Sequence, residues 1–165
     1  MNQPTQAVTN DLSVNAKTTR EIKKKRILVV DDQASNSRLL KLYLEQTNDY
    51  VVREENDARA ALSAAEEFQP DLILLDVMMP GVDGGEVAAR FQANPKLKTV
   101  PIVFVTSVVT KKEVDTGGGQ IGGHSFLAKP VVLTELITCL KHHLGGGAQR
   151  ITGATQNTKP NQTVD

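Results

Sequence analysis

The sequence predicts an α/β fold, a doubly wound sandwich in which helices cover both faces of a parallel sheet. Five short apolar segments alternate with five segments of helical pattern, and the apolar segments are nearly continuous runs of Ile, Leu and Val. Continuous apolar runs are typical of parallel strands that are buried on both faces. Parallel neighbours also need a crossover between them, which the helical segments provide. The length of 165 residues suits a single domain.

The first two strand–helix units follow from apolar periodicity and end signals. Residues 26–30 are predicted as a central strand and residues 50–54 as the second strand. Asn56 is positioned to cap a second helix that runs to about Phe68, where alanines allow close approach to the sheet. The first helix is predicted over residues 35–46, with an apolar stripe formed by Leu39, Leu40, Tyr43 and Leu44.

The remaining three units continue the alternation. Their strands are predicted at residues 72–75, 101–105 and 125–128, and their helices at residues 84–92, 110–116 and 131–144. The helix at residue 110 begins with a capping box, Thr110 with Glu113. It is expected to stop early because the run Gly117–Gly123 follows, and each glycine inside a helix costs about 1 kcal/mol relative to alanine. We therefore expect a mobile loop there, with a rigid non-helical turn as the alternative.

The two ends of the chain differ in composition from its centre. Residues 1–24 and 145–165 are polar, without apolar periodicity, and are predicted as a disordered arm and tail around a folded domain at residues 25–144. The formal net charge is zero and no apolar run reaches membrane-spanning length, so we expect no nucleic acid or membrane partner and a cytoplasmic location. The run Lys23–Arg26 is expected to be a solvated flank, and Cys139 an inert buried thiol.

Polar side chains stand at the ends of four predicted strands. Asp31 and Asp32 follow the first strand, Asp76 the third, Thr106 the fourth and Lys129 the fifth. Because the carboxyl ends of parallel strands meet at one edge of a sheet, these side chains are expected to share a cleft. Clustered carboxylates with one lysine suit a hard divalent cation together with a phosphoryl group.

Four segments in this order resemble the receiver domain of two-component response regulators, the CheY-like family: VVDD, LLDVMMPGVDG, VTS and FLAKP. The resemblance covers residues 25–144. It implies a flavodoxin-like (βα)5 fold with a five-stranded parallel sheet in the order 2-1-3-4-5 and a site at the switch point. It also implies that the Lys129–Pro130 peptide bond is cis.

The resemblance assigns a role to each site residue. Asp76 would accept a phosphoryl group from the phosphohistidine of a histidine kinase or phosphotransfer protein. Mg2+, or alternatively Mn2+, would be bound by Asp31 through water, Asp32, Asp76 and the backbone carbonyl of Met78. The phosphoryl oxygens would be bound by Lys129, Thr106 and the backbone N–H groups of Val77 and Ser107. Thr106 and Phe126 would then switch the face made by the fourth helix, fifth strand and fifth helix, where an unknown partner binds.

The chain is expected to be a signalling protein rather than an enzyme, with slow self-dephosphorylation because the apolar Met78 and Val108 cannot orient a water molecule. Neither a DNA-binding nor a catalytic motif follows residue 144, so we expect a stand-alone, single-domain regulator. An intermediate or phosphate sink in a phosphorelay remains an alternative. A phosphorylation-independent binding module is another, although such a module would be expected to lack one of the acidic residues or the lysine. We further expect phosphorylation or a partner to order the stretch Gly117–Gly123.

Overall fold

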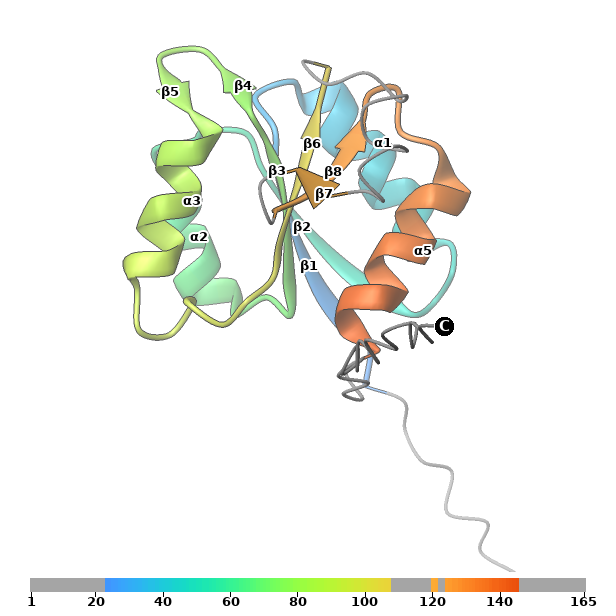
Figure 1. Cartoon of the computed structure of the whole chain (residues 1–165). Coiled ribbons are helices and arrows are strands. Elements are labelled where there is room, and N and C mark those ends of the chain that lie inside the picture. Colours follow the sequence, from blue (N-terminus) through green and yellow to red (C-terminus); the bar gives the residue numbers. More distant parts are fainter. Residues whose placement is uncertain (1–22, 108–119, 122–123, 146–165) are drawn as a thin grey trace, which may run out of the picture.

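The computed structural model describes residues 23–107, 120–121 and 124–145. Strands and helices alternate along the chain (Figure 1). Their bounds are β1 Lys25–Val30, α1 Ala34–Glu45, β2 Tyr50–Glu55, α2 Ala61–Phe68, β3 Leu72–Asp76, β4 Met78–Met79, β5 Val82–Asp83, α3 Gly84–Ala93, β6 Ile102–Thr106, β7 Gln120–Ile121, β8 His124–Ala128 and α5 Leu133–Leu144. The helix predicted over residues 110–116 lies outside the described residues, as do residues 1–22 and 146–165 of the predicted tails.

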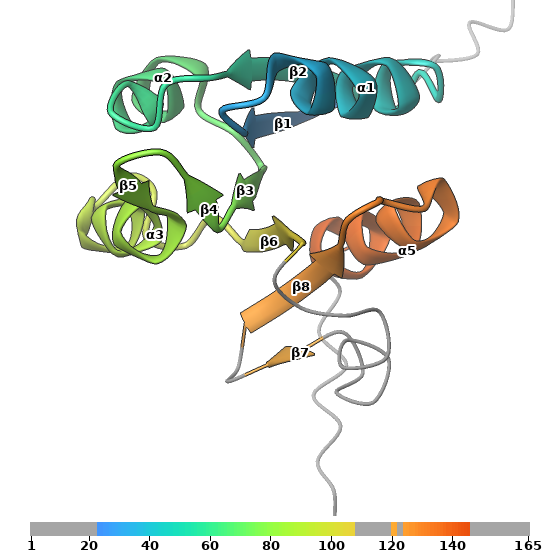
Figure 2. The same cartoon turned by 90° about the horizontal axis from the view of Figure 1, so that it is seen from above.

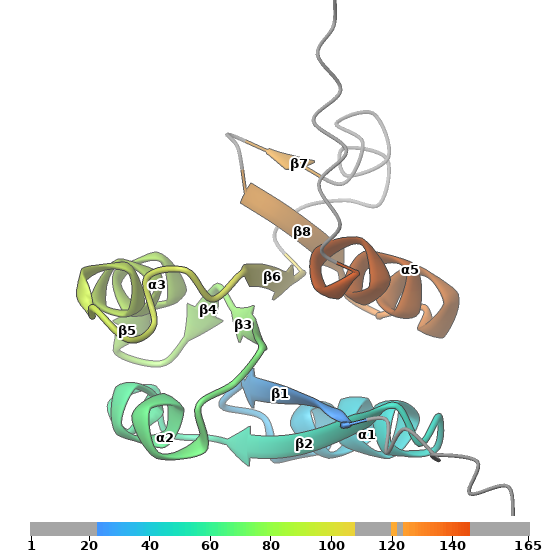
Figure 3. The ribbon, with the colours of Figure 1, turned by 90° about the horizontal axis from the view of Figure 1, so that it is seen from below.

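The main sheet has the order β2-β1-β3-β6-β8-β7. Its first five strands are parallel, which confirms the predicted flavodoxin-like order 2-1-3-4-5. Figures 2 and 3 show these strands in succession, with β7 at the outer edge. The sequence did not predict β7, whose Gln120 and Ile121 pair antiparallel with Ser125 and His124. For these two residues the prediction of a loop was wrong, because their backbone pairs with the edge of β8.

Helices cover both faces of the sheet, α1 and α5 on one side and α2 and α3 on the other (Figure 1). Alternate residues of the central strands divide between two cores. In β1, Ile27 and Val29 pack in the core beneath α1 and α5, whereas Leu28 and Val30 pack in the core beneath α2 and α3. All four are at most 1% exposed. The continuous apolar runs in the sequence therefore reflect burial on both faces, as predicted.

The apolar stripe of α1 is narrower than predicted. Leu40 and Leu44 are buried, at 4% and 0% exposure, but Leu39 is 47% exposed. Leu39 and Tyr43 instead line a pocket described below. The start of α2 also differs: the helix begins at Ala61, and no side chain caps it. Asn56 therefore does not serve as the predicted helix cap. None of the helices that the structure describes has the length and apolar character needed to cross a bilayer.

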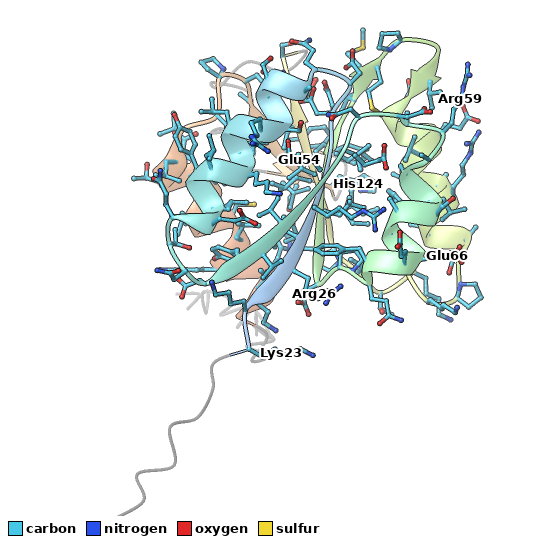
Figure 4. The ribbon with its side chains drawn as sticks, turned by 180° about the vertical axis from the view of Figure 1, so that it is seen from behind. Lys23, Arg26, Glu54, Arg59, Glu66 and His124 are labelled. Atoms are coloured by element: carbon cyan, nitrogen blue, oxygen red, sulfur yellow. The ribbon has the colours of Figure 1, made fainter. Side chains whose placement is uncertain are left out.

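Arg26 is integrated into the fold rather than solvated as predicted (Figure 4). Its Nε donates a hydrogen bond of 2.7 Å to the carbonyl oxygen of Phe68, and its guanidinium lies 4.4 Å from the centre of the Phe68 ring. Such cation–π contacts contribute about 0.5–1 kcal/mol at exposed sites. The Arg26 side chain thus links β1 to the end of α2.

The last turns of α5 carry a thiol and an imidazole that are both partly buried. Burial raises the pKa of Cys139 to about 11, so the thiol stays protonated near neutral pH, in agreement with the predicted inert role. His143 Nε2 lies 2.9 Å from Ser125 Oγ in β8. Burial, together with the neighbouring His142, lowers the pKa of His143 below its ordinary value of 6.5. These surroundings favour the neutral ring.

We expect the free energy of unfolding to decrease as the pH falls below about 6.5. In that range the unfolded chain binds a proton at His143 more readily than the folded chain, so acid favours unfolding, whereas above it the stabilisation is fully present. Thermal unfolding between pH 5 and pH 8 would measure the effect. His143→Gln removes the titrating ring and should flatten this dependence; an unchanged pH dependence in that variant would contradict the assignment.

Candidate functional site

Four strand ends bring the predicted site residues to one edge of the sheet. Asp31 follows β1, Asp76 ends β3, Thr106 ends β6 and Lys129 follows β8. Carboxylate oxygens of Asp31, Asp32 and Asp76 lie within 4.8 Å of one another. Lys129 Nζ is 2.7 Å from Asp31 Oδ2 and 2.7 Å from Asp76 Oδ2. The structure thus brings Asp31, Asp32, Asp76 and Lys129 together in one cleft, as predicted.

Backbone donors hold the two most buried carboxylates in place. Asp31 and Asp76 are only 2% and 4% exposed. Asp31 Oδ1 accepts a hydrogen bond of 2.9 Å from the backbone N–H of Gln33, and Asp76 Oδ1 accepts one of 3.1 Å from that of Met78. Each bond spans two residues, so the segments after β1 and β3 fold back on their own aspartates.

Lys129 is held as a cation between two anions. Burial lowers the pKa of its ammonium group, but the hydrogen bonds and charges of Asp31 and Asp76 outweigh that effect, and the pKa is raised overall. The backbone N–H of Lys129 donates to the carbonyl oxygen of Thr106 at 2.9 Å, which ties the end of β8 to the end of β6. The Lys129–Pro130 bond is cis, as the resemblance implied.

The charges and the geometry of the cluster fit a divalent cation. Three aspartates and one lysine carry formal charges of −3 and +1, which sum to −2. At such separations two like charges repel by about 3–4 kcal/mol at an effective dielectric constant of about 20. Asp32 Oδ1 is also buried without a hydrogen-bond partner among the residues that the structure describes. Buried polar atoms normally have a partner, and hard cations such as Mg2+ bind carboxylate oxygens.

The chain reverses tightly after Asp76. Strands β4 and β5 form a short hairpin around Pro80 and Gly81, and Gly81 has a φ of 74°, the arrangement of a type II turn. Asp83 then caps α3, because its Oδ1 accepts a hydrogen bond of 2.6 Å from Gly85 N–H. Gly84 packs directly on the backbone of Asp76: a Cβ there would overlap the Asp76 carbonyl oxygen and lie 2.8 Å from Val77 Cα. This turn therefore fixes the position of Asp76.

An open pocket of about 590 Å³ lies beside Asp76, between α1 and the connection from β8 to α5. Its lining combines apolar residues such as Leu39, Tyr43 and Met78 with polar ones such as Gln33 and Lys129. Met78 is 62% exposed. The pocket provides access to the Asp76 carboxylate from the surface.

The other predicted site residues occupy the same region to different degrees. Thr106 is buried, at 1% exposure, whereas Ser107 lines the pocket together with Asp76. The Val77 carbonyl accepts a hydrogen bond from Gly84 N–H at 2.9 Å. Phe126 is half-buried and stacks on Phe104, with 5.1 Å between ring centres. Val108 lies outside the described residues.

The sequence analysis missed two polar residues behind the site, Asn56 and Ser37. The side-chain amide of Asn56 donates hydrogen bonds to the Asp31 carbonyl oxygen at 2.6 Å and to Ser37 Oγ at 2.8 Å. One signal could have revealed Asn56, since it follows a parallel strand at the same sheet edge as the aspartates. However, Asn56 also stands where a cap for the following helix is expected, and it was assigned that role instead.

Comparison with curated proteins places these features in one family. The Caulobacter vibrioides response regulator PleD is 40% identical over 106 residues, which is 64% of this chain but only 23% of PleD. The polar-differentiation response regulator DivK of Brucella anthropi is 30% identical over 73% of this chain and 97% of DivK.

Solved structures show the same fold. A putative response regulator from Chloroflexus aurantiacus superimposes with a TM-score of 0.64 and 31% identity, covering 74% of this chain and 99% of the other. The Vibrio cholerae chemotaxis protein CheY4 gives a TM-score of 0.62 at 28% identity, covering 73% of this chain and 99% of the other. The family model for the response regulator receiver domain matches residues 27–141. The chain therefore belongs to the response regulator receiver family.

Proposed function

We propose that this receiver is a Mg2+-dependent switch in which Asp76 accepts a phosphoryl group from a phosphohistidine. Membership of the family supports a phosphoacceptor role in signalling. One observation carries the detailed proposal: the Asp76 carboxylate lies in a cluster with Asp31 and Asp32, and Lys129 contacts it at 2.7 Å. A phosphorylation-independent binding module would not need to retain this complete set.

The transfer uses Asp76 as the nucleophile. A carboxylate oxygen attacks phosphorus, the phosphorus–nitrogen bond to the donor imidazole breaks, and its electron pair returns to the ring nitrogen. Lys129 and the Thr106 hydroxyl bind phosphoryl oxygens, and the backbone N–H groups of Val77 and Ser107 donate to them. Asp32, Asp76 and the Met78 backbone carbonyl would hold Mg2+ directly and Asp31 would hold it through water, and the bound cation would supply positive charge that offsets repulsion between the anions. Mn2+ satisfies the same oxygen ligands.

The donor is a histidine kinase or a histidine phosphotransfer protein that reaches Asp76 through the open pocket. Phosphorylation then alters the surface around β8 and α5 through Thr106 and Phe126, and a partner protein reads that change in the cytoplasm. The same chemistry would serve an intermediate in a phosphorelay.

We expect the acyl phosphate to hydrolyse slowly. The exposed side chain beside it, Met78, has no group that can orient or deprotonate a water molecule. A phosphate-release assay on the phosphorylated chain should show a lifetime of minutes or longer, and loss within seconds would contradict this expectation.

Metal dependence tests the proposal directly. Incubation with acetyl phosphate and Mg2+ should produce a retarded band on a phosphate-affinity gel, because the cation offsets the charge of −2 at the site. Excess EDTA should suppress that band, and added Mg2+ should restore it. Equal phosphorylation with and without the metal would refute the metal-dependent mechanism.

A further inference from the structure

We propose that Asn56 is a positioning residue that holds Asp31 and Asp32 in place for the divalent cation. This inference depends on the metal site in the proposed function. It is based on the two hydrogen bonds of the Asn56 amide, 2.6 Å to the Asp31 carbonyl oxygen and 2.8 Å to Ser37 Oγ. Neither bond involves a carboxylate, so Asn56 acts on the backbone that carries the two aspartates.

The two acceptors lie on either side of the metal-binding segment. The Asp31 carbonyl belongs to the peptide that joins Asp31 to Asp32, so its hydrogen bond fixes the direction in which Asp32 leaves β1. Ser37 lies in the first turn of α1, is fully buried, and donates from Oγ to the Ala34 carbonyl at 3.2 Å. A single amide therefore connects the residues before and after the segment that carries Asp32.

The Asn56 side chain has no competing role in the described structure. The helix that follows it starts at Ala61, five residues further along, and its N-cap position is Ala60. The backbone around Asn56 is fixed as well, because Asp31 N–H donates to the Glu55 carbonyl at 3.2 Å. The hydrogen bond from Asn56 to Asp31 thus continues the connection between β1 and β2 one residue beyond the ends of both strands.

A neutral amide suits this position. The carboxylates of Asp31, Asp32 and Asp76 repel one another, so the β1–α1 segment must be held against separation when no cation is bound. A lysine or arginine would bind the carboxylates and compete with the metal. Asn56 holds the backbone and leaves the carboxylate oxygens for the cation, which is the usual contribution of residues behind metal ligands.

The test compares the Mg2+ affinity of Asn56→Ala with that of the wild-type chain by isothermal titration calorimetry, which is appropriate because the chain contains no tryptophan to report binding. We expect Asn56→Ala to bind Mg2+ about tenfold more weakly, at the lower end of losses found when residues behind metal ligands are removed. In acetyl phosphate assays the half-saturating Mg2+ concentration should rise similarly, whereas the rate at saturating Mg2+ should recover towards the wild-type rate. A purely structural role would not produce that separation.

Two further variants examine the network. Ser37→Ala retains the bond from Asn56 to Asp31 and should weaken Mg2+ binding less than Asn56→Ala does. The double variant should lose less affinity than the sum of the single losses, because the two side chains act together. Asn56→Ser keeps a hydrogen-bond donor but is too short to reach both acceptors. It should also raise the half-saturating Mg2+ concentration, and provides the test if Asn56→Ala does not fold.

Asn94→Ala is the matched control. Asn94 Nδ2 donates to Glu66 Oε1 at 2.9 Å and connects α3 to α2 away from the acidic cluster. This variant should retain wild-type Mg2+ affinity. Folded Asn56 variants with wild-type affinity would overturn the role of Asn56 and leave the metal site intact. A wild-type chain that binds no Mg2+ would overturn the proposed function, and this inference with it.

Discussion

Asp76→Asn is expected to abolish phosphorylation of the chain by acetyl phosphate in the presence of Mg2+. An amide oxygen is a far poorer nucleophile than a carboxylate, and the substitution also removes one of the three anionic groups that would bind the cation. The fold should persist, since Asn is nearly isosteric and its side-chain oxygen can still accept from Met78 N–H, as Asp76 Oδ1 does at 3.1 Å. Phosphate-affinity electrophoresis should therefore show only the unmodified band.

Asp49→Asn provides the control for this experiment. Asp49 immediately precedes β2, at the end of the sheet opposite the acidic cluster, and its side chain is exposed. That variant should be phosphorylated at the wild-type rate. Full labelling of Asp76→Asn would show that another residue accepts the phosphoryl group and would overturn the assignment of Asp76.

Gly84→Ala should produce the largest loss of stability among single-methyl additions at the site. The new Cβ would overlap the Asp76 carbonyl oxygen and lie 2.8 Å from Val77 Cα, and these are backbone atoms that cannot rotate away. Relief requires α3 to move away from β3. We expect a cost of about 3 kcal/mol, at the upper end of typical overpacking effects. Chemical denaturation would measure it, and phosphorylation should slow because Asp76 is displaced.

Gly85→Ala offers a matched comparison one residue further along the helix. Its Cβ would meet only Asp83 Oδ1 at 3.0 Å, the end of a side chain that can shift. Alanine also gains up to about 1 kcal/mol over glycine inside a helix. The free energy of unfolding should thus change little. Equal destabilisation by the two substitutions would show that close backbone approach at Gly84 is not the cause.

The parallel sheet and the acidic cleft could both be predicted from the sequence, because both follow from the order of apolar and polar residues within short segments. Apolar runs buried on two faces identify parallel strands, and the edge where parallel strands end collects whatever polar residues follow them. The sequence alone therefore predicts that Asp31, Asp76 and Lys129 lie together, as their 2.7 Å contacts confirm. The strand order itself came from the family resemblance, since alternation alone does not distinguish one order from another.

The features that were missed depend on contacts between distant segments. Asn56 donates hydrogen bonds to acceptors 25 and 19 positions away in the sequence. An asparagine before a helix suits both a helix cap and such a tertiary contact, so the sequence does not distinguish the two roles. Strand β7 was missed because the cost of glycine in a helix indicates only that the segment is not helical. It does not indicate that the segment pairs with β8. Leu39 was assigned to the core from its spacing alone, but the sheet covers only the row that contains Leu40 and Leu44.

The ammonium group of Lys129, which bonds to Asp31 and Asp76 at 2.7 Å each, gives the cleft a built-in counterion. Under the proposed function, binding of a metal would therefore be an exchange of partners, because carboxylate oxygens already bonded to the ammonium group would have to be shared or released. Once released, the same ammonium group would be available to bind the phosphoryl group that we propose Asp76 accepts. One side chain would thereby stabilise the acidic cluster before phosphorylation and the phosphoryl group after it.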